Sequence, residues 1–177
     1  MKKILFTTLG FPGSGKTYFA RRLARDLGLV HLNSDKIRFS MFKKPQFTLA
    51  EHKKVFGRMD QMAEKYLKES RSVIYDANMT KRKFRHQLKK IADKYGAEYA
   101  LLRFKVPVTI ALARISKRSK YKSELMRKYH RNVDKLTLLT IKREIEEPTK
   151  REMTLIIDAL KPYKKQIQVV TKFLATL

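Results

Sequence analysis

The sequence has no cysteine, few acidic residues and no long apolar run. Without cysteine the chain has neither disulfides nor a thiolate zinc site, which fits a reducing compartment, and we expect a cytoplasmic protein. No window reaches the ~18 apolar residues that a membrane-spanning helix needs, so we expect no membrane partner. The four histidines show no metal-ligand spacing.

The beginning of the chain superficially resembles a signal peptide. Its apolar stretch is short, contains Thr7 and Thr8, and runs into Lys16 and Arg21 without a small-residue cleavage site. We interpret this stretch as a buried first strand.

The shortage of acidic residues leaves a large positive charge. The chain has 42 Lys and Arg against 16 Asp and Glu, a formal net charge of +26. Self-repulsion of this size destabilises a compact fold unless a polyanion or salt neutralises it. We therefore expect nucleic acid as a partner, the alternative being basic residues spread over every solvated face. An anionic membrane surface is less favoured, because no basic amphipathic anchor stands apart from the fold.

Composition and pattern indicate one globular α/β domain over residues 1–177. Apolar residues make up 43% of the chain, with ten Phe and eight Tyr. Segments with strand character alternate with segments of helical periodicity, which implies a parallel sheet with helices on both faces. The capping box Thr48–Glu51 opens one helix, and Thr80 can cap another. The strands are expected at 3–8, 29–32, 72–75, 97–106 and 153–157, and the helices at 16–27, 48–70, 81–95, within 108–147, and at 162–175.

Residues 10–17 read Gly-Phe-Pro-Gly-Ser-Gly-Lys-Thr, directly after the first strand. Gly13 and Gly15 allow backbone angles that let N–H groups converge on phosphate oxygens, with Ser14 between them. Lys16 is expected to bridge the β and γ phosphates, and the Thr17 hydroxyl to ligate Mg²⁺. The motif predicts a nucleoside triphosphate site, the alternative being a glycine turn without a ligand.

The second strand is followed by Asn33-Ser34-Asp35-Lys36-Ile37-Arg38. Neighbouring parallel strands end at one edge, so Asp35 is expected beside the phosphate loop, where a kinase needs a carboxylate to orient an acceptor hydroxyl. Arg38 lies one helical turn further on the same face and suits a phosphate on the acceptor. Alternatively, Asp35 caps a helix and Arg38 is solvated.

The third strand ends at Asp76, in Val73-Ile74-Tyr75-Asp76-Ala77-Asn78. Four strand-like residues before an acid are typical of a carboxylate that supports the Mg²⁺ shell indirectly. Asp76 equally suits a role in orienting Asp35 or Thr17 through hydrogen bonds.

Residues 114–131 form a basic segment that we predict to be a lid. Arg114 and Arg118 are four residues apart, so both can reach over a triphosphate and stabilise charge on the γ-phosphoryl group. A solvated basic face is the alternative. The segment 81–94 is also basic, and we expect unspecific nucleic-acid backbone contact or plain solvation; its cations are Lys81, Arg82, Lys83, Arg85, Lys89, Lys90 and Lys94. Tyr121 and Tyr129 suit base stacking or core packing.

In this order along the chain, these segments resemble the P-loop polynucleotide 5′-hydroxyl kinases and the wider group of small P-loop kinases, the AAA_33 and zeta-toxin-like enzymes. Glu146-Glu147-Pro148 before the last strand belongs to the same resemblance. It implies a P-loop kinase fold with a five-stranded parallel sheet in the order 2-3-1-4-5, helices on both faces and a helical lid. It also implies ATP as donor, Asp35 as general base, Arg38 as acceptor-phosphate contact, and Arg114 with Arg118 as the pair that clamps the nucleotide, Arg118 acting in catalysis.

The predicted function is ATP- and Mg²⁺-dependent phosphorylation of the 5′-hydroxyl end of DNA or RNA. The first alternative keeps the chemistry but has a nucleoside, nucleotide sugar or other metabolite as acceptor, and the second is a nucleic-acid-binding ATPase. Bifunctional relatives carry a phosphatase domain, for which a chain ending at Leu177 has no room, so a phosphatase or ligase is expected to be separate. Oligomeric state stays open.

Overall fold

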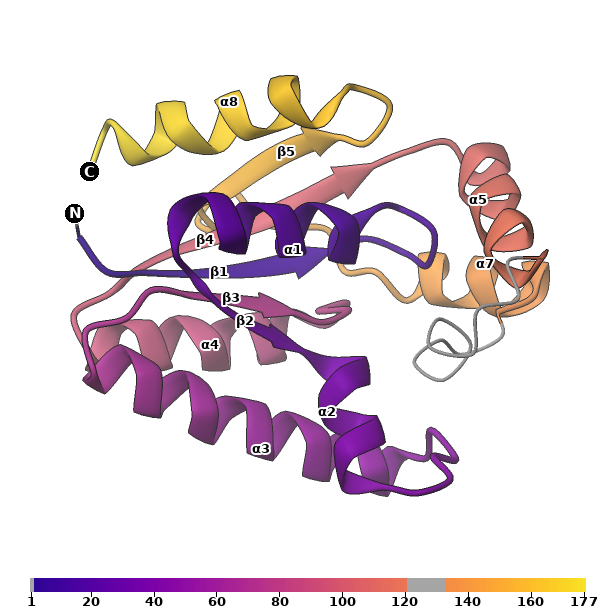
Figure 1. The fold of residues 1–177 in the computed structure, drawn as a ribbon, viewed down its shortest axis with the longest axis horizontal. Coiled ribbons are helices and arrows are strands. Elements are labelled where there is room, and N and C mark those ends of the chain that lie inside the picture. Colours follow the sequence, from indigo (N-terminus) through magenta and orange to yellow (C-terminus); the bar gives the residue numbers. More distant parts are fainter. Residues whose placement is uncertain (1, 121–132) are drawn as a thin grey trace.

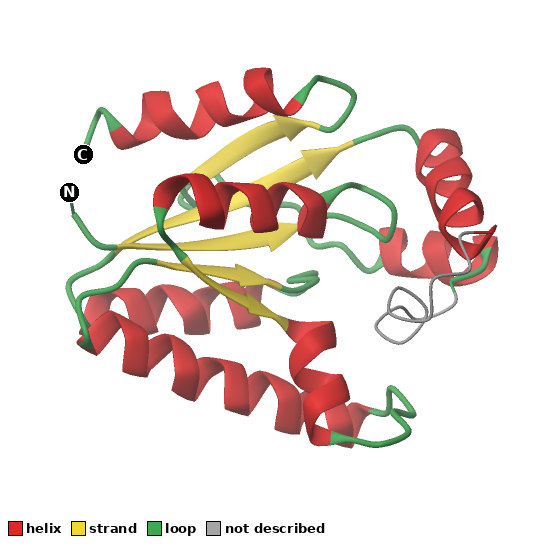
Figure 2. Cartoon of the chain, in the orientation of Figure 1, coloured by secondary structure: helices red, strands yellow, loops and turns green. Residues whose placement is uncertain are grey.

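The computed structural model describes residues 2–120 and 133–177, with side chains for all of these except 118–120. Five parallel strands form one sheet in the order β2-β3-β1-β4-β5, the order that the family resemblance implied (Figure 2). All six residues of the central strand β1 are buried, because helices cover both faces of the sheet. The strands are β1 (Ile4–Leu9), β2 (Val30–Asn33), β3 (Val73–Asp76), β4 (Glu98–Lys105) and β5 (Thr154–Asp158).

The helices form a layer on each face of the sheet and a group beyond its carboxyl edge (Figure 1). One face carries α1 (Lys16–Leu27) and α8 (Tyr163–Leu174), and the other carries α3 (Leu49–Lys68) and α4 (Arg82–Lys94). The short α2 (Ser34–Met41) continues from the end of β2. Beyond the carboxyl ends of the strands lie α5 (Val108–Lys120) and α7 (Lys135–Arg143).

The apolar core has two main layers and one small cluster near the carboxyl edge. The first layer joins the sheet to α3 and α4, and the second joins it to α1 and α8. In the small cluster, buried Phe11 packs with Ala111 of α5 and Leu138 of α7. Phe11 belongs to the predicted phosphate loop, so this cluster anchors the loop to the helices that face it. Among residues 2–120 and 133–177, no helix has both the length and the apolar character to cross a membrane.

The element boundaries follow the predicted ones closely, but α2 was not among the expected helices, and one predicted helix start is wrong. Gly28 (φ 64°) ends α1 in the left-handed conformation, as expected for a glycine at that position. The predicted Thr80 cap is wrong, because α4 begins at Arg82 after Lys81, which provides no side-chain cap. The Arg82 N–H instead donates to a carboxylate oxygen of Glu146 at 2.8 Å. A residue distant in sequence thus satisfies this helix end.

Arg85 does not belong to the solvated basic face that we expected over 81–94. Its side chain is fully buried and donates to both carboxylate oxygens of Glu152, at 2.6 and 3.1 Å. It also donates to the carbonyls of Met79, Thr80 and Glu146, at 3.0, 3.2 and 3.0 Å. These five contacts match the five N–H groups of a guanidinium. Arg85 therefore fixes α4 to the connection before β5.

Candidate functional site

The predicted phosphate loop links β1 to α1 in a conformation that only glycine adopts easily. Gly13 and Gly15 have φ angles of 79° and 92°, in the left-handed region. A Cβ atom at Gly13 would lie 2.5 Å from the carbonyl oxygen of Ala111, so α5 also excludes a larger residue there. Both glycines are required by backbone geometry, and Gly13 also by close packing against α5.

A nucleotide fits this loop only if the loop has hydrogen-bond donors that are not already used within the protein, and it does. The hydroxyl of Ser14 is buried and has no hydrogen-bond partner. Helix α1 begins after Gly15 with no side-chain cap and no acidic residue in its first turn. Backbone N–H groups and a positive helix end are therefore available to an anion, and they fit the phosphates of a nucleotide.

The Lys16 ammonium group lies over the loop that it follows. Its Nζ donates to the carbonyl of Gly10 at 2.6 Å and to that of Phe11 at 3.1 Å. The charge is thus held at the mouth of the cradle. A bridging role between β and γ phosphates requires Nζ to exchange these carbonyls for phosphate oxygens.

Asp76, at the end of β3, is linked by hydrogen bonds to the start of α1 and to β2. Its Oδ1 accepts from the Thr17 hydroxyl at 3.3 Å. Its Oδ2 accepts from the Asn33 amide at 2.6 Å and lies 2.9 Å from His31 Nε2. The carboxylate is almost completely buried. The hydrogen bond to Thr17 agrees with one of the roles predicted for Asp76, the orientation of Thr17.

The Thr17–Asp76 pair also fits a magnesium ion. A hydroxyl and a carboxylate oxygen are the hard ligands that Mg²⁺ uses, and it takes its remaining ligands from phosphates and water. Within residues 2–120 and 133–177 no three His, Asp or Glu side chains form a metal cluster.

Sequence reasoning missed His31 and Asn33 as members of this network. Asn33 pairs in register with Asp76, and His31 lies two residues earlier on the same face of β2. The available signal was a pair of polar residues two positions apart on β2, His31 and Asn33, on a strand next to one that ends in an acid. It could be read only once the adjacency of β2 and β3 was known.

Asp35 lies in the first turn of α2, directly after the strand tip where it was expected. It is not the capping residue of this helix, because the Asn33 side chain accepts the Lys36 N–H at 2.9 Å. Asn33 therefore provides the N-cap of α2, and Asp35 is the acidic residue of its first turn. Since Asn33 also donates to Asp76, one side chain fixes both the start of α2 and the Asp76 carboxylate.

Arg38 is not solvated, contrary to the alternative considered for it. Only 2% of its side chain is exposed, and it lies 3.2 Å from Glu51 and 2.9 Å from His52 Nδ1. Its guanidinium also lies 4.9 Å from the centre of the Phe47 ring, and its Nε has no partner. Contact with an acceptor phosphate stays a prediction, and it requires this intramolecular pairing to open.

Glu51 holds the segment before α3 against Arg38. The predicted capping bond is present, since Thr48 Oγ1 accepts the Glu51 N–H at 3.2 Å. The carboxylate, however, accepts from the N–H groups of Gln46 and Phe47, at 2.8 and 2.7 Å. These backbone donors, first that of Gln46, lower the pKa of Glu51, and Arg38 lowers it further. Glu51 therefore stays charged and able to pair with Arg38.

Arg114 of the predicted lid lies between the phosphate loop and the end of β5. Its Nη2 donates to the carbonyl of Ala159 at 2.7 Å, and its Nη1 lies 3.8 Å from where a Cβ of Gly15 would be. Arg114 is thus beside the cradle, as predicted. The Arg118 side chain and residues 121–131 of the lid, with Tyr121 and Tyr129, lie outside the described residues.

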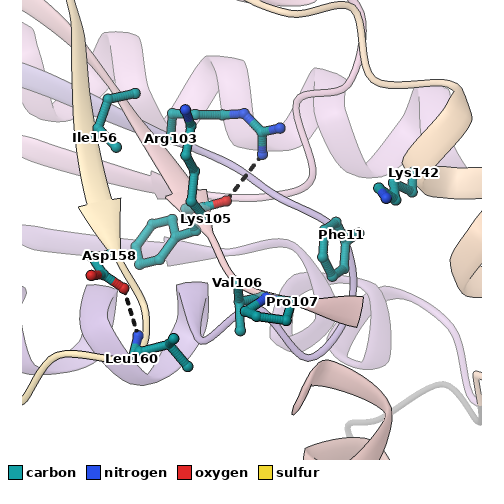
Figure 3. Close-up of a pocket in the computed structure, with 10 residues that line it drawn as sticks. Phe11, Arg103, Lys105, Val106, Pro107, Lys142, Ile156, Asp158 and Leu160 are labelled. Atoms are coloured by element: carbon teal, nitrogen blue, oxygen red, sulfur yellow. Dashed lines mark hydrogen bonds between the residues drawn. The ribbon is translucent and has the colours of Figure 1, made fainter. Parts of the chain in front are cut away.

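A cavity of ≈ 570 Å³ adjoins this site at the ends of β4 and β5 (Figure 3). Phe11 of the phosphate loop lines it together with the apolar Val106, Pro107 and Ile156 and the basic Lys105 and Lys142. None of Lys16, Thr17, Asp35 and Asp76 lines this cavity. It therefore shares a wall with the cradle but contains none of the predicted catalytic groups.

Comparison with solved structures places the fold among P-loop kinases. A putative kinase from Chloroflexus aurantiacus J-10-fl superimposes with a TM-score of 0.76 at 16% identity, covering 97% of this chain and 98% of that chain. A gluconokinase from Sinorhizobium meliloti 1021 gives 0.69 at 16% identity, covering 99% and 92%. The Mycobacterium tuberculosis APS kinase CysC, in complex with AMPPNP and APS, gives 0.69 at 17% identity, covering 98% of both chains.

No curated protein sequence matches the chain significantly. A family model, described as an AAA domain, matches residues 5–148, from the first strand to the end of the Glu146-Glu147-Pro148 segment. This span contains the phosphate loop, Asp35, Asp76 and Arg114. The chain therefore belongs to the AAA_33 family and has the P-loop kinase fold.

Proposed function

We propose that the protein is an ATP-dependent phosphotransferase with a hydroxyl acceptor. The observation that carries the proposal is the hydrogen bond between Thr17, which follows the phosphate loop, and Asp76, whose other oxygen binds Asn33 at the base of α2. These contacts connect the nucleotide side of the site to the helix that carries Asp35. A phosphate cradle and a candidate acceptor carboxylate thus share one rigid sheet edge.

In the proposed reaction, backbone N–H groups of the loop and Lys16 bind the triphosphate. Thr17 and Asp76 would hold Mg²⁺, which neutralises charge on the phosphates. Asp35 orients the acceptor hydroxyl and accepts its proton late in the transfer, while the acceptor oxygen bonds to the γ-phosphorus and the β–γ bridging P–O bond breaks. ADP leaves with the bridging oxygen, and Arg114 stabilises charge on the transferred group.

For the acceptor we favour a small hydroxylated metabolite over a polynucleotide. The gluconokinase and the APS kinase, which share this fold, are named for small acceptors. The net charge of +26 supports a polynucleotide 5′-hydroxyl end as the second candidate. A nucleic-acid-binding ATPase is a third reading, in which the γ-phosphate goes to water.

An acceptor screen with γ-labelled ATP separates these candidates. We expect label in a sugar, nucleoside or other small hydroxyl compound. Transfer only to 5′-hydroxyl oligonucleotides would favour the second candidate, and release of inorganic phosphate alone, with every acceptor, would reject the phosphotransferase.

Salt dependence provides an independent check on the acceptor. For a small acceptor, the KM is expected to change little between ~50 and ~200 mM salt. A polynucleotide held by six to ten phosphate contacts would lose about 10³- to 10⁵-fold in affinity over that range. Steady-state kinetics with the acceptor found in the screen measure this directly.

Lys16→Ala is expected to weaken ATP binding about 10- to 150-fold, because one charge-assisted hydrogen bond to phosphate contributes about 1.5–3 kcal/mol. The fold should persist, since the two carbonyls to which Nζ donates belong to its own loop. Titration calorimetry with a non-hydrolysable ATP analogue and thermal unfolding measure the two effects. The control is Lys172→Ala at the exposed end of α8, which should bind as wild type does. Unfolding of Lys16→Ala at moderate temperature would indicate a purely structural loop.

A further inference from the structure

A second groove, on the sheet face opposite α8, is lined mainly by basic side chains. It has a volume of ≈ 500 Å³ and lies between the first turns of α4 and the connection before β5. One wall is Arg82, Lys83 and His86, and the other is Thr149, Lys150, Arg151 and Glu152. We call this the α4 groove. It shares no residue with the candidate active site.

The positive charge of the α4 groove is not neutralised from within. Arg82, Lys83, Lys150 and Arg151 are exposed, and none forms an ion pair with any described part of the chain. The carboxylate that lines the groove, that of Glu152, accepts from the buried Arg85 through both oxygens. A second carboxylate, that of Glu146, lies beside the groove, where it accepts the Arg82 N–H and pairs with Lys81. The groove therefore presents four cations whose charge this neighbouring anion offsets only in part.

The architecture that holds these cations is rigid. Arg85, one residue from the α4 wall, is buried and binds Glu152 on the opposite wall and the Glu146 carbonyl earlier in the same connection. The Glu152 carboxylate in turn accepts the Thr149 N–H at 3.1 Å. The Arg85 guanidinium thus links the two walls beneath the groove. This link fixes the distance between the cations of one wall and those of the other. A solvated basic helix face would have no such opposing wall.

We propose that the α4 groove binds the phosphate backbone of a single-stranded nucleic acid. Cations on two facing walls suit a chain of regularly spaced anions that passes between them, and guanidinium groups bind phosphate oxygens with directed hydrogen bonds. An acidic protein segment could bind the same groups. However, the chain has 42 basic and 16 acidic residues, and this charge favours a long polyanion that extends beyond the groove. The inference concerns binding only and holds for any acceptor at the active site.

The test is binding of a fluorescein-labelled single-stranded DNA oligonucleotide, followed by anisotropy without ATP. The groove variant is R82Q/K83Q/K150Q/R151Q. The matched control, R21Q/K164Q/K165Q/K172Q, removes the same charge from exposed positions of α1 and α8 on the other face of the sheet (Figure 1). Both variants lose only exposed side chains, and thermal unfolding checks that they are folded.

We expect the groove variant to bind at least about tenfold more weakly than wild type at ~100 mM salt, and the control to remain close to wild type. The slope of log affinity against log salt should fall by about 3 in the groove variant, at ~0.7 for each lost single-strand phosphate contact. Equal losses in both variants, or no binding by wild type, would overturn the proposal. Displacement of the oligonucleotide by poly-L-glutamate at equal charge concentration would also overturn it, in favour of an acidic protein partner. Because no nucleotide is present, a negative result leaves the phosphotransferase proposal unaffected.

Discussion

Asp35→Asn is expected to lower the rate of phosphoryl transfer by about 10²- to 10⁴-fold, the range that a positioned general base contributes. The amide keeps the size of the carboxylate and one acceptor oxygen, but it cannot take the hydroxyl proton. The start of α2 should be unaffected, because Asn33 caps this helix. ATP affinity should also be retained, since Asp35 lies outside the phosphate loop. Initial rates with γ-labelled ATP and a separate titration of an ATP analogue measure both quantities.

The control for this variant is Asp93→Asn, near the far end of α4, where an exposed carboxylate pairs with Lys89. It should transfer phosphate at the wild-type rate. If Asp35→Asn also keeps the wild-type rate, Asp35 is not the catalytic carboxylate. If the wild type only hydrolyses ATP and the variant hydrolyses it equally well, the protein is an ATPase.

Arg85→Ala is expected to lower the free energy of unfolding by about 3–5 kcal/mol, the cost of removing one partner from a buried ion pair. The substitution leaves Glu152 charged and nearly buried, and it removes the donors of three backbone carbonyls. It also leaves a cavity between α4 and the connection before β5. Because a domain of this size is only marginally stable, such a loss removes a large fraction of its stability. Urea unfolding measures it as a lower midpoint with an unchanged m-value.

Lys90→Ala provides the comparison on the same helix. Lys90 is exposed and forms no ion pair within the described residues, so its removal should change stability by no more than about 0.5 kcal/mol. A loss below about 1 kcal/mol for Arg85→Ala would mean that the buried network contributes little. In that case the two walls of the α4 groove would not depend on it.

The residues of the candidate site at the carboxyl edge of the sheet were predictable because their signals are local in sequence. The phosphate loop needs glycines at fixed positions, a strand before it and a helix after it, and all three are visible within residues 4–27. Asp35 and Asp76 followed from the rule that parallel strands end at one edge. The sheet order came from family resemblance and is confirmed by the strand pairing.

The contacts that sequence reasoning missed join segments that are distant in the chain. Arg85 lies three and seven residues before Leu88 and Ala92, on the buried face of α4, but its partner Glu152 comes 67 residues later. Arg38 is likewise buried because the start of α3 folds back over it. Helical periodicity places Arg85 on the apolar face of α4, but it does not identify the carboxylate that allows an arginine to be buried there. Such partners become visible only when the tertiary arrangement is known.

The central claim is that Asp35 faces the terminal phosphoryl group from the acceptor side. The most direct measurement is the structure of the complex with ADP, Mg²⁺ and aluminium fluoride, whose metal-fluoride group mimics the transferred phosphoryl. We predict the Asp35 carboxylate within about 2.6–3.2 Å of the oxygen in the attacking position. A complex in which ADP occupies the loop while Asp35 points away from the fluoride group, with another residue or solvent in its place, would contradict the account.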